Sequence, residues 1–329
     1  MTGATTTFAI ELAGSGGIEQ FRPAERPLLQ PGAGEAQILH TAIGVNFVDI
    51  YHRTGLYPAG PLPAVLGVEG AGVVTAVGPG VEGLSAGMRV AYAGLPVGGY
   101  AQARNIAAAR LVPVPDAIDD RTAAAAMLRG ITAHMLLRRV RPVGPGSTVL
   151  VHAAAGGLGL VLTAWASRLG ARVIGTAGSS AKADLARARG AEHVILYKEE
   201  DFVAEVRRLT QGVGVDVAYD GIGGDTLLRT LDAVRPFGMV ASIGQAAGSL
   251  PQIALTDLGP RRSLALSRPS VFAYANDPVA YRQAAQDLFE EIARGLPVTI
   301  GAELPLVRVA DAHVMLERGE TTGSLLLVP

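Results

Sequence analysis

The stretch VLVHAAAGGLGL, residues 149–160, decides the fold class of this chain. An apolar run ends at His152, and a Gly-rich turn and a second apolar run follow it. Ala154, Gly156 and Gly159 occupy the three positions of the G-x-G-x-x-G pattern, with alanine in place of the first glycine. The second glycine of that pattern lets backbone approach a pyrophosphate, and the third lets helix and strand pack closely. The stretch therefore predicts a strand, a dinucleotide-binding turn and a helix.

The surrounding sequence supplies the context that this degenerate pattern requires. Strands alternate with helices, which indicates a parallel sheet with right-handed crossovers. Strands are expected at residues 148–152, 172–176, 193–197, 215–220, 239–243 and 264–267. Helices are expected from the Gly turn to residue 169 and at residues 181–189, 202–210 and 226–234. The alternative is an ordinary tight turn in which glycine only supplies backbone freedom. His152 is expected to be a hydrogen-bonded core residue beside the loop, because buried polar groups are usually satisfied.

The remainder of the chain has a different pattern of apolar and turn residues. Short apolar runs separated by Gly and Pro fill the first 120 residues or so, which is typical of an irregular β-rich domain. The expected elements there and after residue 268 are strands at residues 37–43, 70–77, 89–93 and 323–328, loops at residues 58–63, 78–87 and 113–116, and a helix at residues 278–294. We therefore expect one domain from residues 1–125 and 269–329 and a second, dinucleotide-binding domain from residues 126–268.

The composition narrows the class of protein. Hydrophobic residues make up 49% of the 329 residues, charged residues make up 17%, and the formal net charge is -1. Such a chain favours large buried cores, and it favours neither nucleic acid nor an anionic membrane as the main partner. The uncharged run at residues 149–166 is long enough to cross a bilayer, but the glycines in its middle divide it. The chain has no Cys, which fits a reducing cytoplasm, and its beginning does not have the pattern of a signal peptide.

The second expected strand indicates which dinucleotide binds. Folds that bind NAD place Asp or Glu about 20 residues past the glycines, where it contacts the ribose 2′-hydroxyl. Here that place reads Thr-Ala-Gly-Ser-Ser at residues 176–180, and Lys182 follows. Ser and Lys can bind a 2′-phosphate that a carboxylate would repel, so we expect NADPH. The alternative is that Lys182 is a solvated residue of the next helix.

A family resemblance covers nearly the whole chain in order. The segments that carry it are NFVDIYHRTGLYP (46–58), LGVEGAGVVTAVGPGV (66–81), HAAAGGLGL (152–160), GTAGSSAKADLA (175–186), ILYKEED (195–201) and LSRPS (266–270). With these segments the chain resembles the NADPH-dependent quinone oxidoreductases, the zeta-crystallin-like group of the zinc-free medium-chain dehydrogenase/reductase superfamily. The resemblance implies a GroES-like catalytic domain built from both chain ends, a Rossmann domain between them, and a homodimer.

The resemblance also implies roles for single residues. It places Asn46, Tyr51 and Tyr57 in the catalytic site. It implies cofactor contacts for Asn46, Tyr51, Thr132, Ala154, Gly156, Gly157, Leu158, Gly178, Ser179, Lys182, Tyr197, Ile243, Gly244 and Arg268. One departure is Gly221, where relatives often have Ser after the Asp of the fourth strand.

Zinc-containing members of the superfamily carry a Cys near the start of the Asn46 segment and a Gly-His-Glu triplet in the Gly67 segment. This chain has Asn46 and Gly67-Val68-Glu69 at those places, so no metal is expected. The alternative is a metal site formed by Asp49, His52 and Glu69 instead of the usual ligands. We instead expect Asp49 and His52 to be solvated and Glu69 to be structural.

The residues of the Asn46 segment could also have purely structural roles. Asn46 and Asp49 are three residues apart and would share a helical face that meets cofactor or substrate. Alternatively, Asn46 caps the helix and Asp49 is a surface carboxylate. Tyr51 and Tyr57 suit the wall of a pocket for a planar ligand, or serve in packing alone.

These observations predict metal-independent reduction of a quinone by NADPH. The second hypothesis is an NADPH-dependent enoyl or alkenal reductase in which Tyr57 donates the proton. A non-enzymatic hypothesis is a crystallin-like or RNA-binding protein. The near-neutral net charge disfavours RNA as the main ligand.

Overall fold

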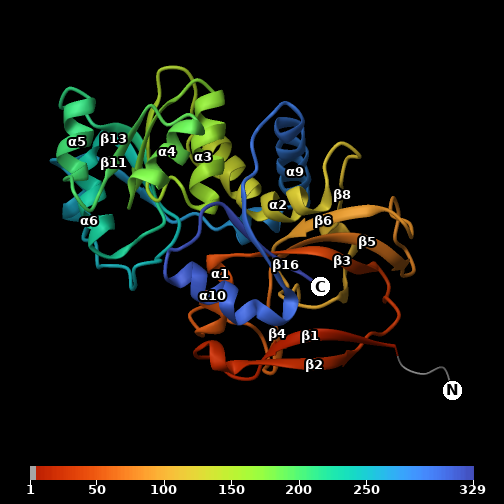
Figure 1. Ribbon diagram of the computed structural model, residues 1–329. Coiled ribbons are helices and arrows are strands. Elements are labelled where there is room, and N and C mark those ends of the chain that lie inside the picture. The colour runs from red at the N-terminus through yellow and green to blue at the C-terminus, as the bar shows by residue number, and fades with distance from the viewer. Residues whose placement is uncertain (1–4) are drawn as a thin grey trace. The chain divides into compact units, whose positions relative to one another are not determined.

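The structure is a computed structural model that describes residues 5–329, and the chain divides into two units with separate sheets and cores (Figure 1). The first unit contains the residues up to Ile131 together with Phe272–Pro329, and the second contains Thr132–Val271. Both boundaries fall a few residues later than the sequence predicts. The first lies inside one continuous helix, α2 (Asp120–His134), so no break in secondary structure marks it.

The second unit is built on six parallel strands. They are β9 (Thr148–Val151), β10 (Arg172–Ala177), β11 (His193–Leu196), β12 (Val215–Asp220), β13 (Val234–Ser242) and β14 (Ala265–Ser267). They lie in the order β11-β10-β9-β12-β13-β14, and every neighbouring pair is parallel. The winding reverses between β9 and β12. In open sheets of this kind ligands bind at that switch point, beyond the carboxyl ends of the strands.

Helices connect these strands. They are α3 (Gly157–Arg168), α4 (Ser180–Ala188), α5 (Phe202–Leu209) and α6 (Gly224–Ala233), followed by the short α7 (Leu255–Leu258), and α2 leads into a π-helical turn, η3 (Met135–Val140). Residues four apart form the buried stripes of α5 and α6: Phe202 with Val206, and Leu227 with Leu231. Both stripes pack in one core with β-strand residues such as Leu150. This spacing is that of one helical face.

The uncharged run at residues 149–166 is shared by β9, the following turn and α3. Among residues 5–329, no helix has both the length and the apolar character needed to span a membrane.

Two sheets form the first unit. The larger contains β3 (Glu35–Val45), β5 (Glu69–Val77), β6 (Arg89–Ala93), β7 (Ala103–Ala107), β8 (Val112–Pro113), β15 (Ile300–Pro305) and β16 (Ser324–Val328). Its order is β15-β16-β3-β5-β6-β8, and β7 also pairs with β3. The smaller sheet has the order β2-β1-β4, with β1 (Thr6–Leu12), β2 (Phe21–Pro27) and β4 (Ala64–Val65).

The last part of the chain is integral to this unit. Strand β16 runs antiparallel to β3, with Leu326 opposite Gly44, so the C-terminal strand lies beside an N-terminal one (Figure 1). Besides most of α2, the helices of the unit are α1 (Phe47–Arg53), α8 (Val271–Ala275), α9 (Pro278–Ala293) and α10 (Val309–Glu317), with 3-10 turns η1 (Ile18–Gln20), η2 (Ala108–Arg110) and η4 (Leu306–Arg308). Close packing joins α2 to α9, because a Cβ on Gly130 would lie 2.4 Å from the side chain of Leu288.

Candidate functional site

The turn between β9 and α3 has the local geometry of a dinucleotide-binding loop. Ala153 adopts the left-handed conformation with φ of 50°, although it is not a glycine. A Cβ on Gly159 would lie 2.2 Å from the Ala153 carbonyl oxygen, so only glycine lets α3 pack so close to the turn. Packing on the neighbouring strand explains why alanine stands in the first glycine position. A Cβ on Gly175 of β10 would lie 2.7 Å from the Cβ of Ala154, so Gly175 makes the room that Ala154 occupies.

The N-terminus of α3 is suited to an anion. Gly156 is its N-cap residue and provides no capping side chain. The N–H groups of the first helical turn have no intrahelical acceptor, and the helix dipole favours negative charge there. A Cβ on Gly156 would meet only the Ala153 carbonyl, at 3.2 Å, so most of the space beside this glycine is open. Gly157 and Leu158 begin the helix beside it. These features fit the pyrophosphate of a dinucleotide.

Donor groups gather at the carboxyl end of β10. Ser179 is the N-cap residue of α4, and its hydroxyl accepts from the backbone N–H of Lys182 at 3.5 Å. A Cβ on Gly178 would lie 2.9 Å from the Tyr197 hydroxyl and 3.5 Å from Cε of Lys198. Residues 176–180 contain no carboxylate. This arrangement fits a 2′-phosphate, which needs donors and cations rather than acceptors.

Sequence reasoning missed Lys198. A signal was available, because Lys182 and Lys198 are the only two lysines among the 329 residues. The two lie on neighbouring elements, since β11 pairs with β10 and residues 197 and 198 follow β11 directly.

The remaining cofactor-binding candidates of the second unit lie past the ends of β13 and β14 or in α2. The backbone N–H of Ile243 donates to the Asp220 carbonyl at 2.7 Å. A Cβ on Gly244 would lie 2.8 Å from the Gly221 carbonyl oxygen, so the two loops touch. Arg268 donates to the Ser242 hydroxyl at 2.9 Å and to the Gln245 side chain at 3.1 Å.

Two more of these positions need a comment. Thr132 lies in α2, at the first residue of the second unit, and is half-buried. Serine would fit at Gly221, because a Cβ there would make only an ordinary contact with Ile243 at 3.8 Å.

In the first unit, Asn46 begins the helix that carries Tyr51. Asn46 is the N-cap residue of α1, and its backbone N–H donates to the Asp49 carboxylate at 2.8 Å. Its side-chain amide donates to Glu69 Oε2 at 2.7 Å. Because a carboxylate only accepts hydrogen bonds, this contact fixes which way the Asn46 amide points. Asn46 therefore acts as a cap and is also held in one orientation by a residue far away in sequence.

Glu69 is a fully buried structural carboxylate. Its Oε1 accepts from the backbone N–H of Leu128 at 2.6 Å, and its Oε2 lies 3.3 Å from Nη1 of Arg129. Arg129 also donates to the Val45 carbonyl at 2.9 Å. A Cβ on Gly44 would lie 2.3 Å from Glu69 Oε2, so Gly44 leaves the room that the carboxylate fills. The expectation that Glu69 is structural agrees with this network.

The expectation that Asp49 and His52 are solvated is wrong. Asp49 is 0% exposed and His52 is 2% exposed. Asp49 is turned back to the start of its own helix, and His52 Nδ1 lies 3.0 Å from the Pro58 carbonyl. A three-residue spacing cannot distinguish an outward carboxylate from one that caps the helix end.

Each side chain considered as a metal ligand makes at least one hydrogen bond within the protein, although Asp49 Oδ1 and His52 Nε2 are buried without a hydrogen-bond partner among the described residues. Asp49 and Glu69 accept from backbone and side-chain donors, and His52 pairs with a carbonyl. Within residues 5–329, no group of three or more His, Cys, Asp or Glu side chains is arranged to hold a metal ion.

Tyr51 and Tyr57 lie against each other. Their ring centroids are 5.3 Å apart in an edge-to-face arrangement, and the backbone N–H of Tyr57 donates to the Tyr51 carbonyl at 3.0 Å. The ring of His52 packs on Tyr57 with centroids 6.0 Å apart. Tyr51 is buried and Tyr57 is half-buried, so the structure brings these two predicted residues together in one aromatic group.

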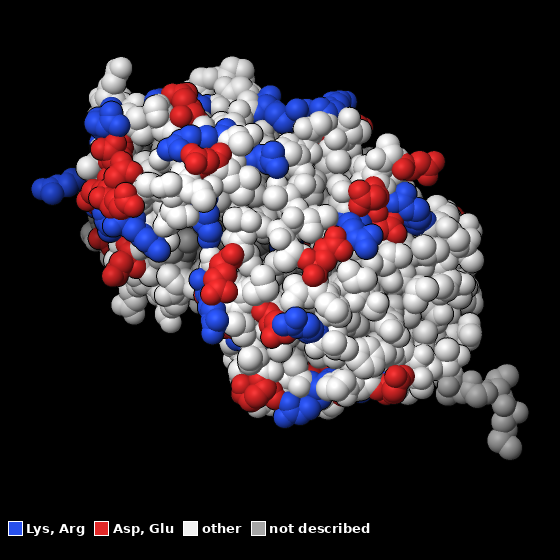
Figure 2. All heavy atoms as spheres, in the orientation of Figure 1, with Lys and Arg blue, Asp and Glu red and all other residues white. Residues whose placement is uncertain are grey.

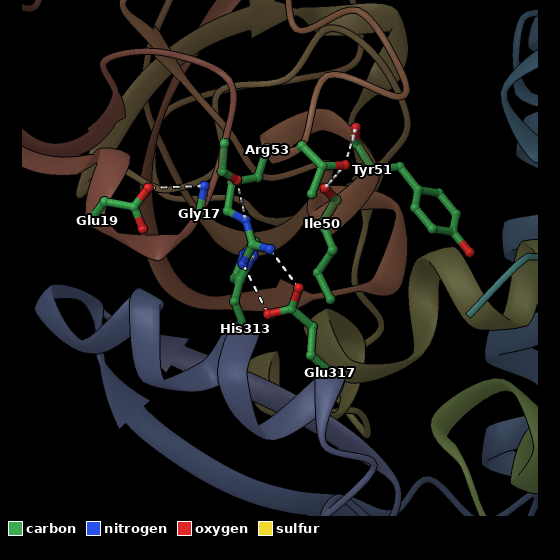
Figure 3. Close-up of polar contacts among 9 residues, drawn as sticks. Gly17, Glu19, Ile50, Tyr51, Arg53, His313 and Glu317 are labelled. Atoms are coloured by element: carbon green, nitrogen blue, oxygen red, sulfur yellow. Dashed lines mark hydrogen bonds and ion pairs between the residues drawn. The ribbon is translucent and has the colours of Figure 1, made fainter. Parts of the chain in front are cut away.

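Arg53 ties α1 to the last helix of the chain (Figure 3). Its guanidinium donates to both carboxylate oxygens of Glu317, at 3.2 and 2.5 Å, and to the Gly16 carbonyl at 3.1 Å. It also lies 3.5 Å from Nδ1 of His313, whose pKa is lowered to about 3 by burial and, secondarily, by the charge of Arg53. Tyr51 points away from this group (Figure 3). The placement of α1 thus depends on residues more than 250 positions later.

Burial raises the pKa of Asp49 to about 7, while the Asn46 N–H and Tyr100 act in the opposite sense. A carboxyl whose pKa is raised on folding stabilises the protein below its unfolded pKa, and this stability is lost as pH rises through the folded pKa. Asp49→Asn should remove that dependence. We expect the difference in unfolding free energy between variant and wild type to change by about 2 kcal/mol between pH 5 and pH 7, in favour of the variant at pH 7. Urea unfolding at both pH values measures it, and a pH-independent difference would contradict the assignment.

Comparison with known proteins agrees with this organisation. Residues 32–116 match the family described as alcohol dehydrogenase GroES-like domain, and residues 157–289 match the family described as zinc-binding dehydrogenase. The fold class predicted from the sequence, a GroES-like β-rich domain with a Rossmann domain, is therefore confirmed. The second family description mentions zinc, but this chain has no Cys, and it has Val68 where the Gly-His-Glu triplet would place His.

Individual relatives match over almost the whole chain. The quinone oxidoreductase of Pseudomonas aeruginosa is 42% identical over 97% of this chain and 99% of that protein. A 2-haloacrylate reductase of a Burkholderia species is also 42% identical, over 95% of this chain and 96% of that protein. The crystal structure of Escherichia coli quinone oxidoreductase complexed with NADPH is 40% identical, covers 98% of this chain and 100% of its own, and superposes with a TM-score of 0.95. This chain therefore belongs to the quinone oxidoreductase family of the medium-chain dehydrogenases/reductases.

Proposed function

We propose that this protein is an NADPH-dependent quinone oxidoreductase that needs no metal ion. The observation that carries the proposal is the end of β10, where Tyr197 and Lys198 lie beside Gly178, Ser179 and Lys182 begin the next helix, and residues 176–180 contain no carboxylate. Donors and cations in that place favour the 2′-phosphate of NADPH. The relatives named above support the reaction class, since one of them is a quinone oxidoreductase solved with NADPH.

NADPH supplies the hydride when it is bound, and a quinone with one solvent proton becomes a hydroquinone as NADPH becomes NADP⁺. The protein's part is to bind, to orient and to exclude water. A quinone accepts electrons readily, so the reaction demands no strong acid from the chain. We propose that the α3 N-terminus binds the pyrophosphate through the backbone of Ala154, Gly156, Gly157 and Leu158, and that Thr132, Ile243, Gly244 and Arg268 contact the central and nicotinamide parts.

We also propose Asn46, Tyr51 and Tyr57 as the residues at the nicotinamide and substrate. Glu69 holds the Asn46 amide in one orientation and the two tyrosines form one aromatic wall, which supports a fixed planar site. The direct test is NADPH oxidation with a panel of quinones, 2-alkenals and enoyl thioesters, before and after exhaustive chelation. Turnover of quinones that survives chelation supports the proposal. A stoichiometric, tightly bound zinc whose removal abolishes turnover refutes it.

A second candidate is an NADPH-dependent enoyl or alkenal reductase. The similarity to a 2-haloacrylate reductase favours it, because a haloacrylate is a conjugated alkene. Tyr57 would then protonate carbon. A non-enzymatic role as a crystallin-like or RNA-binding protein has less support. On the face shown in Figure 2, Lys and Arg lie interspersed with Asp and Glu, whereas RNA would favour a continuous basic surface.

Tyr57→Phe separates the two enzyme classes. With quinones, we expect the variant to keep its turnover nearly unchanged, because no carbon needs an enzyme-supplied proton. With conjugated alkenes as the true substrates, the loss should be on the order of 10² to 10⁴ in rate, the usual size of general-acid catalysis. Tyr57→Leu is the matched control, since it also removes the ring that packs on Tyr51 and His52. A large loss with benzoquinone-type substrates in Tyr57→Phe would contradict the quinone assignment.

We further propose a homodimer and a cytoplasmic location. Strand β14 is at the edge of the six-stranded sheet, and an unpaired edge favours pairing with a second chain. The absence of Cys supports a reducing compartment. Light scattering at micromolar concentration tests the dimer, and a monomeric mass would exclude it.

A further inference from the structure

A chain of buried polar groups crosses the core of the second unit beneath the dinucleotide loop. His152 is its centre. Nδ1 of His152 lies 3.1 Å from the Thr176 hydroxyl, and Nε2 lies 2.9 Å from the Thr230 hydroxyl. The Thr230 hydroxyl lies 3.1 Å from Oδ2 of Asp220. Each of these four side chains is at most 6% exposed, so each needs partners within the protein.

This hydrogen-bonded series of side chains ends on backbone N–H groups of two different loops. At one end, the N–H of Ala153 donates to the Thr176 hydroxyl at 3.3 Å. At the other, Oδ1 of Asp220 accepts from the N–H groups of Ile222 and Gly223 at 2.8 and 2.9 Å. Ala153 lies in the turn after β9, and residues 221–223 form the turn after β12. These two strands are neighbours on either side of the switch point of the sheet.

One set of proton positions makes the chain directional from end to end. Ala153 donates to Thr176, and the Thr176 hydroxyl donates to Nδ1 of His152. Nε2–H of His152 then donates to Thr230, and the Thr230 hydroxyl proton is shared between Asp220 Oδ2 at 3.1 Å and the Thr226 carbonyl at 2.7 Å. This pattern needs a neutral imidazole with its proton on Nε2. Burial lowers the pKa of His152, while Asp220 acts in the opposite sense, so the neutral form is favoured.

Such a network is stable only when every member is satisfied, because an unpaired buried polar group costs more than a hydrogen bond contributes. Loss of one hydroxyl therefore disturbs both turns. The ring of Phe202 from α5 packs edge-on against His152, with centroids 5.0 Å apart, and holds the imidazole in its plane. His152 is thus fixed by two hydrogen bonds and one aromatic contact.

We propose that His152, with Thr176, Thr230 and Asp220, is a positioning group that locks the turns after β9 and β12 into the conformation that binds the dinucleotide. This inference rests on the proposed function, since it assigns these turns to NADPH. None of the four side chains is proposed to touch the cofactor. They act by fixing two stretches of backbone at once, so their effect falls on cofactor affinity and on the alignment of the bound nicotinamide.

The test uses Thr230→Val, which keeps the shape and removes the hydroxyl, and Thr230→Ser, which keeps the hydroxyl. NADPH dissociation constants are measured by fluorescence titration at a temperature where each variant remains folded. We expect Thr230→Val to weaken NADPH binding by roughly tenfold, equivalent to about 1.4 kcal/mol. Thr230→Ser should bind NADPH within about twofold of wild type, because it loses one methyl group and keeps the hydroxyl that the hydrogen-bond network needs. Native-state hydrogen exchange should quicken at Ala153, Ile222 and Gly223 in Thr230→Val.

A double-mutant cycle with Thr176→Val examines whether the two halves act as a unit. If they do, either variant alone interrupts the hydrogen-bond network, so the double variant should bind NADPH little worse than each single variant. A wild type that does not bind NADPH would refute the proposed function. A Thr230→Val that binds NADPH as wild type does, or effects of the two variants that simply add, would overturn the inference and leave the proposed function standing.

Discussion

Arg129→Met is expected to destabilise the first unit by about 3 to 5 kcal/mol, the usual loss when one partner of a buried ion pair is removed. Glu69 is 0% exposed and Arg129 is 6% exposed, so neither charge reaches water. Without Arg129, the Glu69 carboxylate keeps the Asn46 amide and the Leu128 N–H but has no opposite charge. The cost arises from an uncompensated buried charge. Urea unfolding, followed by a probe in the first unit, measures it.

Two controls separate this effect from a general loss of an arginine. Arg121 pairs with Glu303 at 2.9 Å, but both side chains are at least 36% exposed, so Arg121→Met should cost at most about 1 kcal/mol. The double variant Glu69→Gln with Arg129→Met carries no charge at either position of the pair and should recover part of the stability. An Arg129→Met variant no less stable than Arg121→Met would show that the buried pair contributes nothing.

The pH dependence of the same variant has a definite sign. Burial raises the pKa of Glu69, and the Arg129 charge opposes that rise. Removing Arg129 should therefore raise the pKa of Glu69 further. A carboxyl with a raised folded pKa destabilises the protein as pH rises through that pKa. The loss of stability in Arg129→Met should accordingly be larger at pH 8 than at pH 5, and a loss that grows toward acid would contradict this account.

Lys182→Ala is expected to raise the KM for NADPH by roughly ten- to a hundredfold and to leave the KM for NADH nearly unchanged. Hydrogen bonds to a charged group contribute roughly 1.5 to 3 kcal/mol, and about 1.4 kcal/mol is a tenfold change in affinity. NADH has no 2′-phosphate, so it loses nothing. Added salt should weaken NADPH binding more than NADH binding, because the charge pair is exposed to screening. Steady-state kinetics of wild type and variant with both cofactors measure these differences.

The two lysines allow a second readout that does not depend on turnover. Lys182 and Lys198 are the only side-chain amines in the chain, so an amine-reactive reagent followed by peptide mass spectrometry reports on each of them separately. We expect NADPH to protect both lysines and NADH to protect them much less. Lys198→Ala should give a smaller effect of the same kind as Lys182→Ala. Equal losses for NADPH and NADH in Lys182→Ala, with no protection of Lys182, would show that it is a solvated helix residue.

The strength of the local signals explains which elements the sequence predicts well. The strand expected at residues 89–93 is β6 (Arg89–Ala93), and the helix expected at 181–189 is α4 (Ser180–Ala188), because glycines lie close to both ends of each element. The sequence analysis did not predict β1, β2, β15 or α10. Strand β2 has one buried residue in seven, so it has little apolar pattern to recognise.

The sequence by itself determined the fold class, the dinucleotide loop and the lack of a carboxylate after β10, because each rests on residues adjacent in the chain. Only the tertiary structure decided which polar side chains are buried and with which partner. Asp49 and His52 are residue types usually found at the surface, but here they are buried. Glu69 pairs with Arg129, which lies 60 residues later in the sequence. Lys198 joins Gly178 only because β11 pairs with β10. Such contacts depend on long-range packing, which brings together residues that no local pattern relates.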